Sequence, residues 1–335
     1  MTNDLPKLHF GRLLIEELTS GDTGKSIIYT QKVPWELYGD RFALSPIKTV
    51  TIAEVSLESL NGLLNNLADF DTVIAFGGGL AIDAAKYVAW KAGKRFIAIP
   101  TVISADVSVC RAVAVRQDWK VRYLGDKMPD QLIIDFDIIQ SAPPHINRGG
   151  ICDILSCYTA LKDWEISNAD IGEAIDLQKV EKTRGLLSRL FEHQKEIHDV
   201  TEDGIKFLIE GYIEEVRLCE EYGSPRPEEG SEHFFAYNLE YLMRRGFLHG
   251  NIVSLGVVLM TILQERDPRQ IVDFLEGAGV LWRPENAGIS EQDIVHAVET
   301  LHDYCIDEKF YYTVINQKRP DKKTALKLLK TLGNL

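Results

Sequence analysis

The hydrophobic pattern of this chain changes once, near a pair of prolines, and that change restricts the folds that the sequence can adopt. Before Pro143-Pro144, short β-branched runs alternate with helical patterns, of which 57–67 and 81–92 are the clearest. We expect five strands, at residues 26–30, 47–51, 72–76, 96–100 and 131–135. Strands separated by helices in this way indicate crossover units on a largely parallel sheet.

The second half of the chain repeats its apolar residues with the period of a helix. We expect helices at residues 153–164, 176–191, 204–219, 232–244 and 252–264. Consecutive prolines stop helices and stiffen connections, so the boundary is expected at that point. The sequence therefore predicts a Rossmann-like α/β domain over residues 1–145 and an all-α domain over residues 146–335.

Composition excludes several classes of protein. The formal charge of −13 repels phosphate backbones, so nucleic acid is not an expected partner. Residues 1–6 lack the basic and apolar regions of a secretory signal, and the most apolar stretch, 252–263, is too short to span a bilayer. Five cysteines without a CxxC pair argue against a disulfide framework. We expect a cytoplasmic protein with no membrane insertion.

A glycine turn follows the expected strand at 72–76. Gly77-Gly78-Gly79 runs directly into the helical pattern at 81–92. Glycines let the backbone approach a pyrophosphate, and the helix N-terminus offers free N–H groups to the anion. A tight turn without a ligand explains three glycines equally well. Asp83 and Lys86 favour a nucleotide site, because the spacing GGGxxxDxxK resembles the dinucleotide signature of the glycerol dehydrogenase and iron-containing alcohol dehydrogenase superfamily.

The choice between NAD and NADP depends on the end of an earlier strand. NAD-specific sites commonly place a carboxylate there to bind the adenosine ribose. Here the strand ends Tyr29-Thr30-Gln31-Lys32, with no acid and with a lysine nearby. Either cofactor is therefore compatible with the sequence, and NADP is the preferred one.

One aspartate and two histidines are candidate metal ligands. Taken singly, Asp153 is typical of a helix N-cap, and His233 and His249 are typical of polar residues on helices. Together, three such ligands from three helices would leave a position open for substrate, as catalytic zinc sites do.

The segments around these residues resemble sn-glycerol-1-phosphate dehydrogenases. That family carries G-x-x-D-(I/L)-(I/L)-S-x-Y-T-A-x-x-D-W, S-R-P-x-x-G-S-E-H and L-H-G stretches, and most of each is present here, at 149–164, 224–233 and 248–250. The resemblance implies a dehydroquinate synthase-like fold, with Asp153, His233 and His249 as ligands of Zn²⁺ and Fe²⁺ as the second choice.

A loop after the strand at 96–100 matches the family's P-T-x-x-S-x-D pattern. By that resemblance Thr101 and Ser104 contact the cofactor, and Asp106 contacts the substrate. A polar turn after a strand would look similar. The cofactor site then consists of Gly77, Gly78, Gly79, Asp83, Lys86, Thr101, Ser104 and Cys110, and the catalytic residues are Asp106 and Asp153.

Four positions depart from the family pattern. Val107 stands where the family has glycine, and Cys110 where it has a serine that contacts the cofactor. Tyr237 replaces a substrate-binding histidine one helical turn after His233, and Asn251 replaces a glutamate. The sequence therefore constrains the reaction type more than the substrate.

The resemblance implies reversible, metal-dependent hydride transfer between NAD(P) and a small polyol phosphate, reducing dihydroxyacetone phosphate to sn-glycerol 1-phosphate. Asp106 and Tyr237 are expected to orient hydroxyls, and Arg226 and Lys162 to hold the phosphate. We also expect a homo-oligomer.

Three alternatives stay open. One is a sugar-phosphate cyclase like dehydroquinate synthase, although such cyclases use a glutamate where this chain has Asp153. The others are a dehydrogenase of the superfamily with a different alcohol substrate, and a non-catalytic protein that retained the metal and nucleotide sites.

Overall fold

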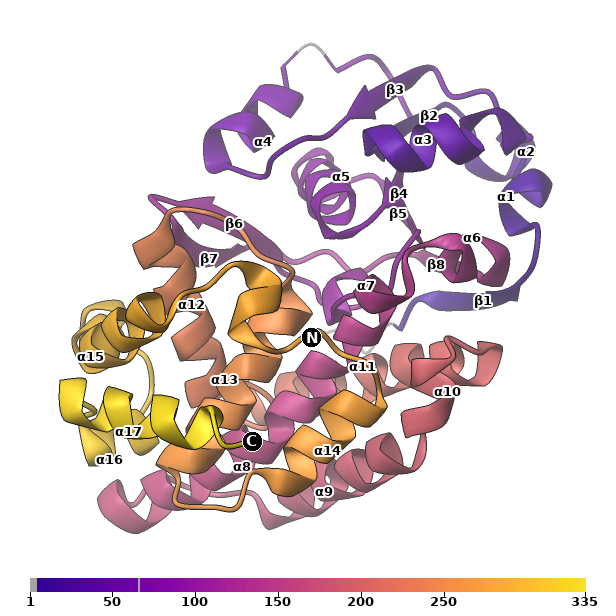
Figure 1. Cartoon of the computed structure of the whole chain (residues 1–335). Helices are drawn as coiled ribbons and strands as arrows, with labels where there is room; N and C mark the ends of the chain where they lie inside the picture. The colour runs from indigo at the N-terminus through magenta and orange to yellow at the C-terminus, as the bar shows by residue number, and fades with distance from the viewer. Residues whose placement is uncertain (1–4, 66) are drawn as a thin grey trace. The chain divides into compact units, whose positions relative to one another are not determined.

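The computed structural model describes residues 5–65 and 67–335, and it forms two compact units, Met1–Asn147 and Arg148–Leu335 (Figure 1). The sequence predicts this boundary between residues 145 and 146. Residues 1–4, which belong to the segment used to argue against a secretory signal, lie outside the described residues. So does residue 66 of the helical pattern expected at 57–67.

The first unit is built on a six-stranded parallel sheet with the strand order β1-β8-β5-β4-β2-β3. Its strands are β1 (Lys7–Gly11), β2 (Ser26–Thr30), β3 (Lys48–Thr51), β4 (Thr72–Gly77), β5 (Arg95–Pro100) and β8 (Gln131–Asp135). Its helices include α1 (Leu14–Glu17), α2 (Ser20–Thr23), α3 (Lys32–Tyr38), α4 (Leu57–Leu63), α5 (Gly79–Ala92) and α6 (Phe136–Ser141), and α7 (Pro144–Arg148) runs across its last residue. All five strands predicted from β-branched runs are present, and the predicted α/β class is confirmed.

Three strands were not predicted. β1 has no β-branched residue, so its propensity is weak and its place comes from pairing with β8. β6 (Val113–Gln117) and β7 (Lys120–Leu124) form a separate antiparallel hairpin. Its turn residues Asp118 and Trp119 have φ of 52° and 65°, as a two-residue hairpin turn requires.

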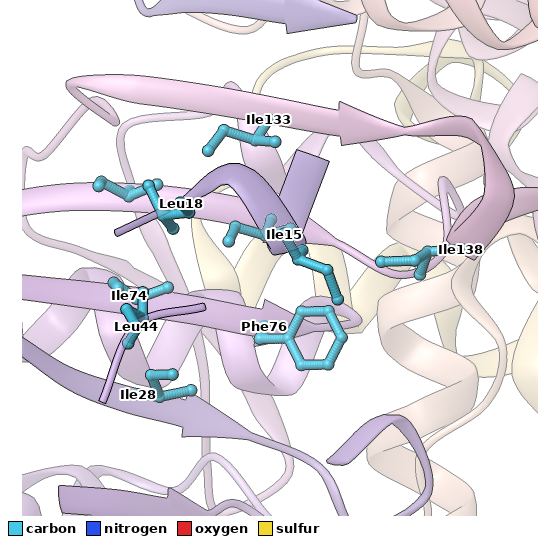
Figure 2. Close-up of a cluster of buried hydrophobic side chains, with 10 residues drawn as sticks. Ile15, Leu18, Ile28, Leu44, Ile74, Phe76, Ile133 and Ile138 are labelled. Atoms are coloured by element: carbon cyan, nitrogen blue, oxygen red, sulfur yellow. The ribbon is translucent and has the colours of Figure 1, made fainter. Parts of the chain in front are cut away.

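The apolar residues of the sheet form a tightly packed core. Alternate residues of β4 and of β5 share one face with a residue each from β2 and β8, and they meet side chains from α1 and α6 there (Figure 2). The cluster comprises Ile15, Leu18, Ile28, Leu44, Ile74, Phe76, Ile97, Ile99, Ile133 and Ile138. Each side chain of this size stabilises the fold by about 1.5–3 kcal/mol when it is fully buried. The core therefore holds the strand ends in fixed positions.

The strand order reverses direction at β2. The chain first adds β3 on one side of β2 and then adds β4 on the other side. In open parallel sheets, ligands bind beyond the carboxyl ends of the strands at such a switch point. Here these ends are Thr30 of β2 and Gly77 of β4, followed by α5, which packs against β4 and β5.

The second unit is helical. Its helices are α8 (Cys152–Ile171), α9 (Leu177–Glu192), α10 (Gln194–His198), α11 (Glu202–Tyr222), α12 (Ser231–Met243), α13 (His249–Leu263), α14 (Arg269–Gly277), α15 (Glu291–Glu308), α16 (Val314–Lys318) and α17 (Lys322–Leu332). α13 packs against both α8 and α12, and almost every one of its residues is buried. Within the part of the chain that the structure describes, every helix falls short of the length and apolarity that crossing a membrane would require.

Candidate functional site

The glycine turn lies at the switch point of the first unit. A Cβ atom on Gly77 would lie 2.7 Å from Ala81 Cβ, so a larger residue does not fit there. Gly78 caps α5, and its N–H donates a hydrogen bond of 2.7 Å to Gln31 Oε1. The side chain that follows β2 is thereby joined to the turn that follows β4.

Gln31 stands near the place where NAD-specific sites carry an acid. Its neutral amide brings no negative charge to the turn, so it does not repel a 2′-phosphate. Lys32, the next residue, is exposed and lies 3.8 Å from Glu36. This surface is compatible with either nicotinamide cofactor.

The two polar residues of the GGGxxxDxxK signature brace a neighbouring loop. Lys86 is fully buried, and its ammonium donates to the carbonyls of Val107 at 2.9 Å and Ala112 at 2.8 Å. Its Nζ also lies 3.6 Å from Asp83 Oδ1, which accepts a bond of 3.4 Å from the Ala114 N–H. Lys86 and Asp83 therefore position the backbone of residues 107–114.

The loop residues predicted to contact the cofactor follow β5. Thr101 is buried and its N–H donates to the Gly77 carbonyl at 3.1 Å, which joins this loop to the glycine turn. Ser104, Asp106 and Cys110 are partly exposed, and the Cys110 N–H donates to the Asp106 carbonyl.

Val107, one of the departures from the family pattern, packs against the start of α5. Its Cγ1 lies 3.8 Å from the position of a Cβ atom on Gly79. The branched side chain thus borders the glycine turn itself.

The ionisation of Asp83 makes a testable contribution to stability. Burial raises the pKa of Asp83 to about 6, against the opposing effects of Lys86 and the Ala114 N–H. Because the folded carboxyl keeps its proton at a pH where the unfolded one has lost it, stability falls as the pH rises from about 4 through 6. A rise from 3.8 to about 6 corresponds to roughly 3 kcal/mol.

We expect the Asp83→Asn variant to lack this component of the pH dependence. Urea unfolding at pH 4.5 and 7.5, measured for both proteins, should show the wild type losing stability relative to the variant as the pH rises. Parallel pH profiles would refute this assignment.

The three predicted metal ligands of the second unit lie together. Asp153 is in the first turn of α8, His233 is in the first turn of α12, and His249 is the first residue of α13. Asp153 Oδ1 lies 3.2 Å from His249 Nε2 and 3.8 Å from His233 Nε2. Ligand atoms at about 2.1 Å from a tetrahedral cation would be roughly 3.4 Å apart, close to these two distances from Asp153. Among the described residues, the groups whose ligand atoms lie within 4.8 Å of one another join Asp153 to His249 and Asp153 to His233 separately.

The electrostatics of this cluster favour positive charge. Burial alone would raise the pKa of Asp153, but hydrogen bonds with His233 and His249 outweigh it and hold the pKa well below its usual range. Burial alone would lower the pKa of His233, but hydrogen bonds with Asp153 and Glu232 hold it well above its usual value. A divalent cation that displaces the protons of the two histidines would supply the positive charge that those protons bring. The donor set therefore fits Zn²⁺ or Fe²⁺.

Glu232 orients His233 from behind. Its Oε1 lies 3.0 Å from His233 Nδ1 and accepts the Gly230 N–H at 2.6 Å, and its Oε2 accepts the Thr159 hydroxyl at 2.6 Å. With Nδ1 donating to this carboxylate, Nε2 is the ring nitrogen that faces Asp153 and that would bind a cation after losing its proton. Such carboxylate partners of metal-bound histidines fix the tautomer and the ring orientation.

Replacing Glu232 with glutamine is expected to weaken metal binding by about 10–100-fold, the usual effect of losing an outer partner of a ligand. Titration of the metal-free protein with zinc against a chromophoric chelator measures it. Glu240→Gln, at another buried glutamate of α12, is the control and should leave the affinity unchanged. Equal affinities for the Glu232 variant and the wild type would contradict the role.

Of the residues predicted to bind substrate, some lie near the predicted metal ligands and others do not. Tyr237 lies beside His233, with ring centroids 5.8 Å apart, and its hydroxyl donates to Glu229 Oε2 at 3.1 Å. Asn251 lies close to Gly149, one turn before Asp153. These two positions border the cluster of predicted ligands.

Arg226 and Lys162 are not brought to that cluster. The Arg226 side chain is almost fully buried, pairs with Glu173 at 2.8 Å and donates to the carbonyl of Tyr312. Lys162 comes nine residues after Asp153 on α8, which places it on the opposite face about 13 Å along the axis. Its ammonium pairs with Glu165 at 3.1 Å.

Sequence reasoning gave no role to four acids that stand in the motifs of the predicted ligands. Glu228 and Glu229 precede α12, Glu232 supports His233, and Asp163 accepts the Ser231 N–H at 2.8 Å where α12 begins. The sequence feature that could have identified these acids is their position in the same motifs as the predicted ligands. Acids next to metal-binding histidines often hydrogen-bond to them.

Comparisons with known proteins agree with this arrangement. The sequence model of the family described as iron-containing alcohol dehydrogenase matches residues 21–143. A glycerol-1-phosphate dehydrogenase, NAD(P)+, from Staphylothermus marinus is 30% identical over 263 residues, which cover 78% of this chain and 73% of that protein. The protein of the same name from Hyperthermus butylicus is 28% identical over 330 residues, which cover 96% and 93%.

Solved structures show the same fold. Glycerol dehydrogenase from Schizosaccharomyces pombe superposes with a TM-score of 0.71 at 14% identity, covering 98% of this chain and 88% of that one. A probable glycerol dehydrogenase from Sinorhizobium meliloti gives a TM-score of 0.70 at 17% identity, covering 90% and 88%. At these identities the likeness concerns the fold alone, and it matches the predicted dehydroquinate synthase-like class.

Proposed function

We propose that this chain, which belongs to the glycerol-1-phosphate dehydrogenase family, reduces dihydroxyacetone phosphate to sn-glycerol 1-phosphate with NADPH or NADH. It is an NAD(P)-linked, metal-dependent oxidoreductase that acts on a small molecule. The observation that carries the proposal is the convergence of Asp153, His233 and His249 from three helices.

The proposed reaction consumes one ketone, one NAD(P)H and one proton, and yields the secondary alcohol and NAD(P)+. The cation that Asp153, His233 and His249 would hold acts, when bound, as a Lewis acid that polarises the carbonyl and stabilises the alkoxide. Glu232 keeps His233 in the tautomer that such a site needs. The nicotinamide supplies the hydride.

Other residues take supporting parts in the proposal. Tyr237 is positioned by Glu229 and offers its hydroxyl beside His233. In the first unit, the glycine turn and the N-terminus of α5 bind the pyrophosphate, while Asp83 and Lys86 hold the loop that carries Asp106. Because Arg226 Nη2 and the ammonium of Lys162 pair with glutamates away from the predicted ligands, we assign the phosphate to another group.

Several finer features belong to the same proposal. Zinc is the favoured cation, since a carboxylate and two imidazoles are donors that suit it. NADP is the favoured cofactor, because Gln31 replaces an acid at the switch point. We place the protein in the cytoplasm, as a homo-oligomer.

A steady-state assay tests the proposal. Purified zinc-loaded protein is mixed with NADPH or NADH and either dihydroxyacetone phosphate or unphosphorylated dihydroxyacetone. We expect net loss of nicotinamide absorbance with the phosphate ester, and chiral analysis of the product should find the sn-1 isomer. Turnover of dihydroxyacetone alone would instead support a dehydrogenase for a different alcohol.

The same assay separates the alternative reactions. A cyclase returns the hydride within one turnover, so a seven-carbon sugar phosphate would be consumed without net change in absorbance. Tight zinc binding without turnover of any ketone or alcohol would favour a non-catalytic protein.

A further inference from the structure

Glu228 lies within reach of the cation that Asp153 and His233 would hold. One carboxylate oxygen of Asp153, one of Glu228 and one ring nitrogen of His233 lie within 4.8 Å of one another. Two ligands at about 2.1 Å from one cation are at most about 4.2 Å apart. A small rotation of side chains therefore brings all three atoms onto one ion.

The backbone at Glu228 is fixed against the helix that carries Asp153. The hydroxyl of Ser156, one turn after Asp153, donates to the Glu228 carbonyl at 2.7 Å. The Glu228 N–H also donates to the Pro225 carbonyl at 3.0 Å, which closes a turn over residues 225–228. These two hydrogen bonds hold the backbone of Glu228 at a fixed position beside α8, as a metal ligand requires.

The charge of the cation is a reason to expect a second carboxylate among its ligands. A divalent cation bound by one carboxylate and two neutral imidazoles keeps one positive charge, and a buried charge without a partner is costly. Glu232 contacts His233 and not the other predicted ligands, so among the groups that could bind the cation directly, coordination by Glu228 brings the sum of charges to zero. Two carboxylates with two imidazoles also form a donor set that suits Zn²⁺, Fe²⁺ and Mn²⁺.

We infer that Glu228 is a fourth ligand of the cation in the resting protein, occupying the position that the substrate oxygen takes during turnover. The inference rests on the proposed metal site, but it is independent of which ketone is reduced. Catalytic zinc sites keep one position for substrate, or expand to five ligands. Glu228 on its loop is the ligand that makes way.

A second set of side chains, which contains a thiol, could supply the fourth ligand instead. Cys152, Asp153 and His249 also present ligand atoms within 4.8 Å of one another. However, the Cys152 thiol donates its proton to Asp153 Oδ1 at 3.1 Å, and a thiol must lose that proton to bind a metal. In this arrangement Cys152 supports Asp153 and does not replace Glu228.

The test compares Glu228→Gln with Glu229→Gln, which removes the same charge from the neighbouring position. Zinc affinity is measured by chelator competition, and the thermal midpoint in chelator checks that each metal-free variant is folded. We expect Glu228→Gln to weaken zinc binding by at least about tenfold, the least that loss of an outer partner costs, and Glu229→Gln by less than about threefold. Equal effects of the two variants, or none at Glu228, would overturn the inference.

Cobalt provides a second measurement. Glu228→Gln should change the visible bands of the cobalt-loaded protein, because these bands depend on the number of ligands. A near-ultraviolet thiolate band that disappears in Cys152→Ser would assign the fourth ligand to Cys152 and overturn the inference. His233→Ala should abolish tight binding; if it does not, the proposed metal site is itself wrong, which distinguishes that failure from the failure of Glu228.

Discussion

Replacing Asp153 with asparagine is expected to abolish most of the activity while leaving the fold intact. Asparagine has the same shape but lacks the charge that attracts both histidines and the cation. Lewis-acid stabilisation supplies several kcal/mol to the transition state, so kcat/KM should fall by at least about 1000-fold. Steady-state kinetics and the bound zinc of the purified variant, measured by elemental analysis, check both parts.

Asp170→Asn is the matched control. Asp170 lies on the same helix, where it accepts a hydrogen bond from Tyr312, outside the cluster of ligands. This variant should keep full zinc content and near wild-type kcat/KM. An Asp153 variant that retained zinc and a tenth of the activity would show that the cation is held elsewhere.

Replacing Gly250 with alanine is expected to cause the largest loss of stability. A Cβ atom there would lie 2.1 Å from the Gly149 carbonyl oxygen and 2.5 Å from its carbon, both of which are backbone atoms that cannot rotate away. The two glycines set the approach of α13 to the start of α8, and so the spacing of His249 from Asp153. We expect a cost of about 3 kcal/mol or more, at the upper end of overpacking.

The measurement is thermal unfolding together with zinc titration. The midpoint of the second unit should fall by roughly 6–12 °C, and zinc binding should weaken because the ligands separate. Gly185→Ala is the control on α9, where the nearest atom to the new Cβ is Arg189 Nη1 at 3.8 Å. It should raise stability by up to about 1 kcal/mol. Equal midpoints for the Gly250 variant and the wild type would contradict the packing argument.

Much of the fold followed from local patterns. The strands at 26–30, 72–76 and 131–135 are fully or largely buried, so they needed continuous β-branched sequence and were visible in it. β1 and the hairpin β6-β7 were not predicted from the sequence, because these strands depend on pairing and turn geometry more than on composition. Helix positions followed the apolar period, while their ends shifted by up to several residues, as at 152–171 for the expected 153–164.

The clustering of Asp153, His233 and His249 was easier to predict than the placement of the residues around them. Asp153, His233 and His249 stand in motifs, so their meeting required only the family fold. The roles of Arg226 and Glu228 depend on a proline-rich loop that has no helical or strand period, and no pattern tells where its side chains point. For Lys162 the helical period was already informative, since nine residues after Asp153 is two and a half turns.

The most direct test is metal removal followed by reconstitution. The protein is stripped with a chelator, its zinc content is measured, and reduction of dihydroxyacetone phosphate by NADPH is followed before and after zinc is added back. We predict loss of turnover on stripping and recovery that saturates at one zinc per chain. Undiminished turnover in protein that holds no metal would contradict the assignment of Asp153, His233 and His249 as the catalytic metal site.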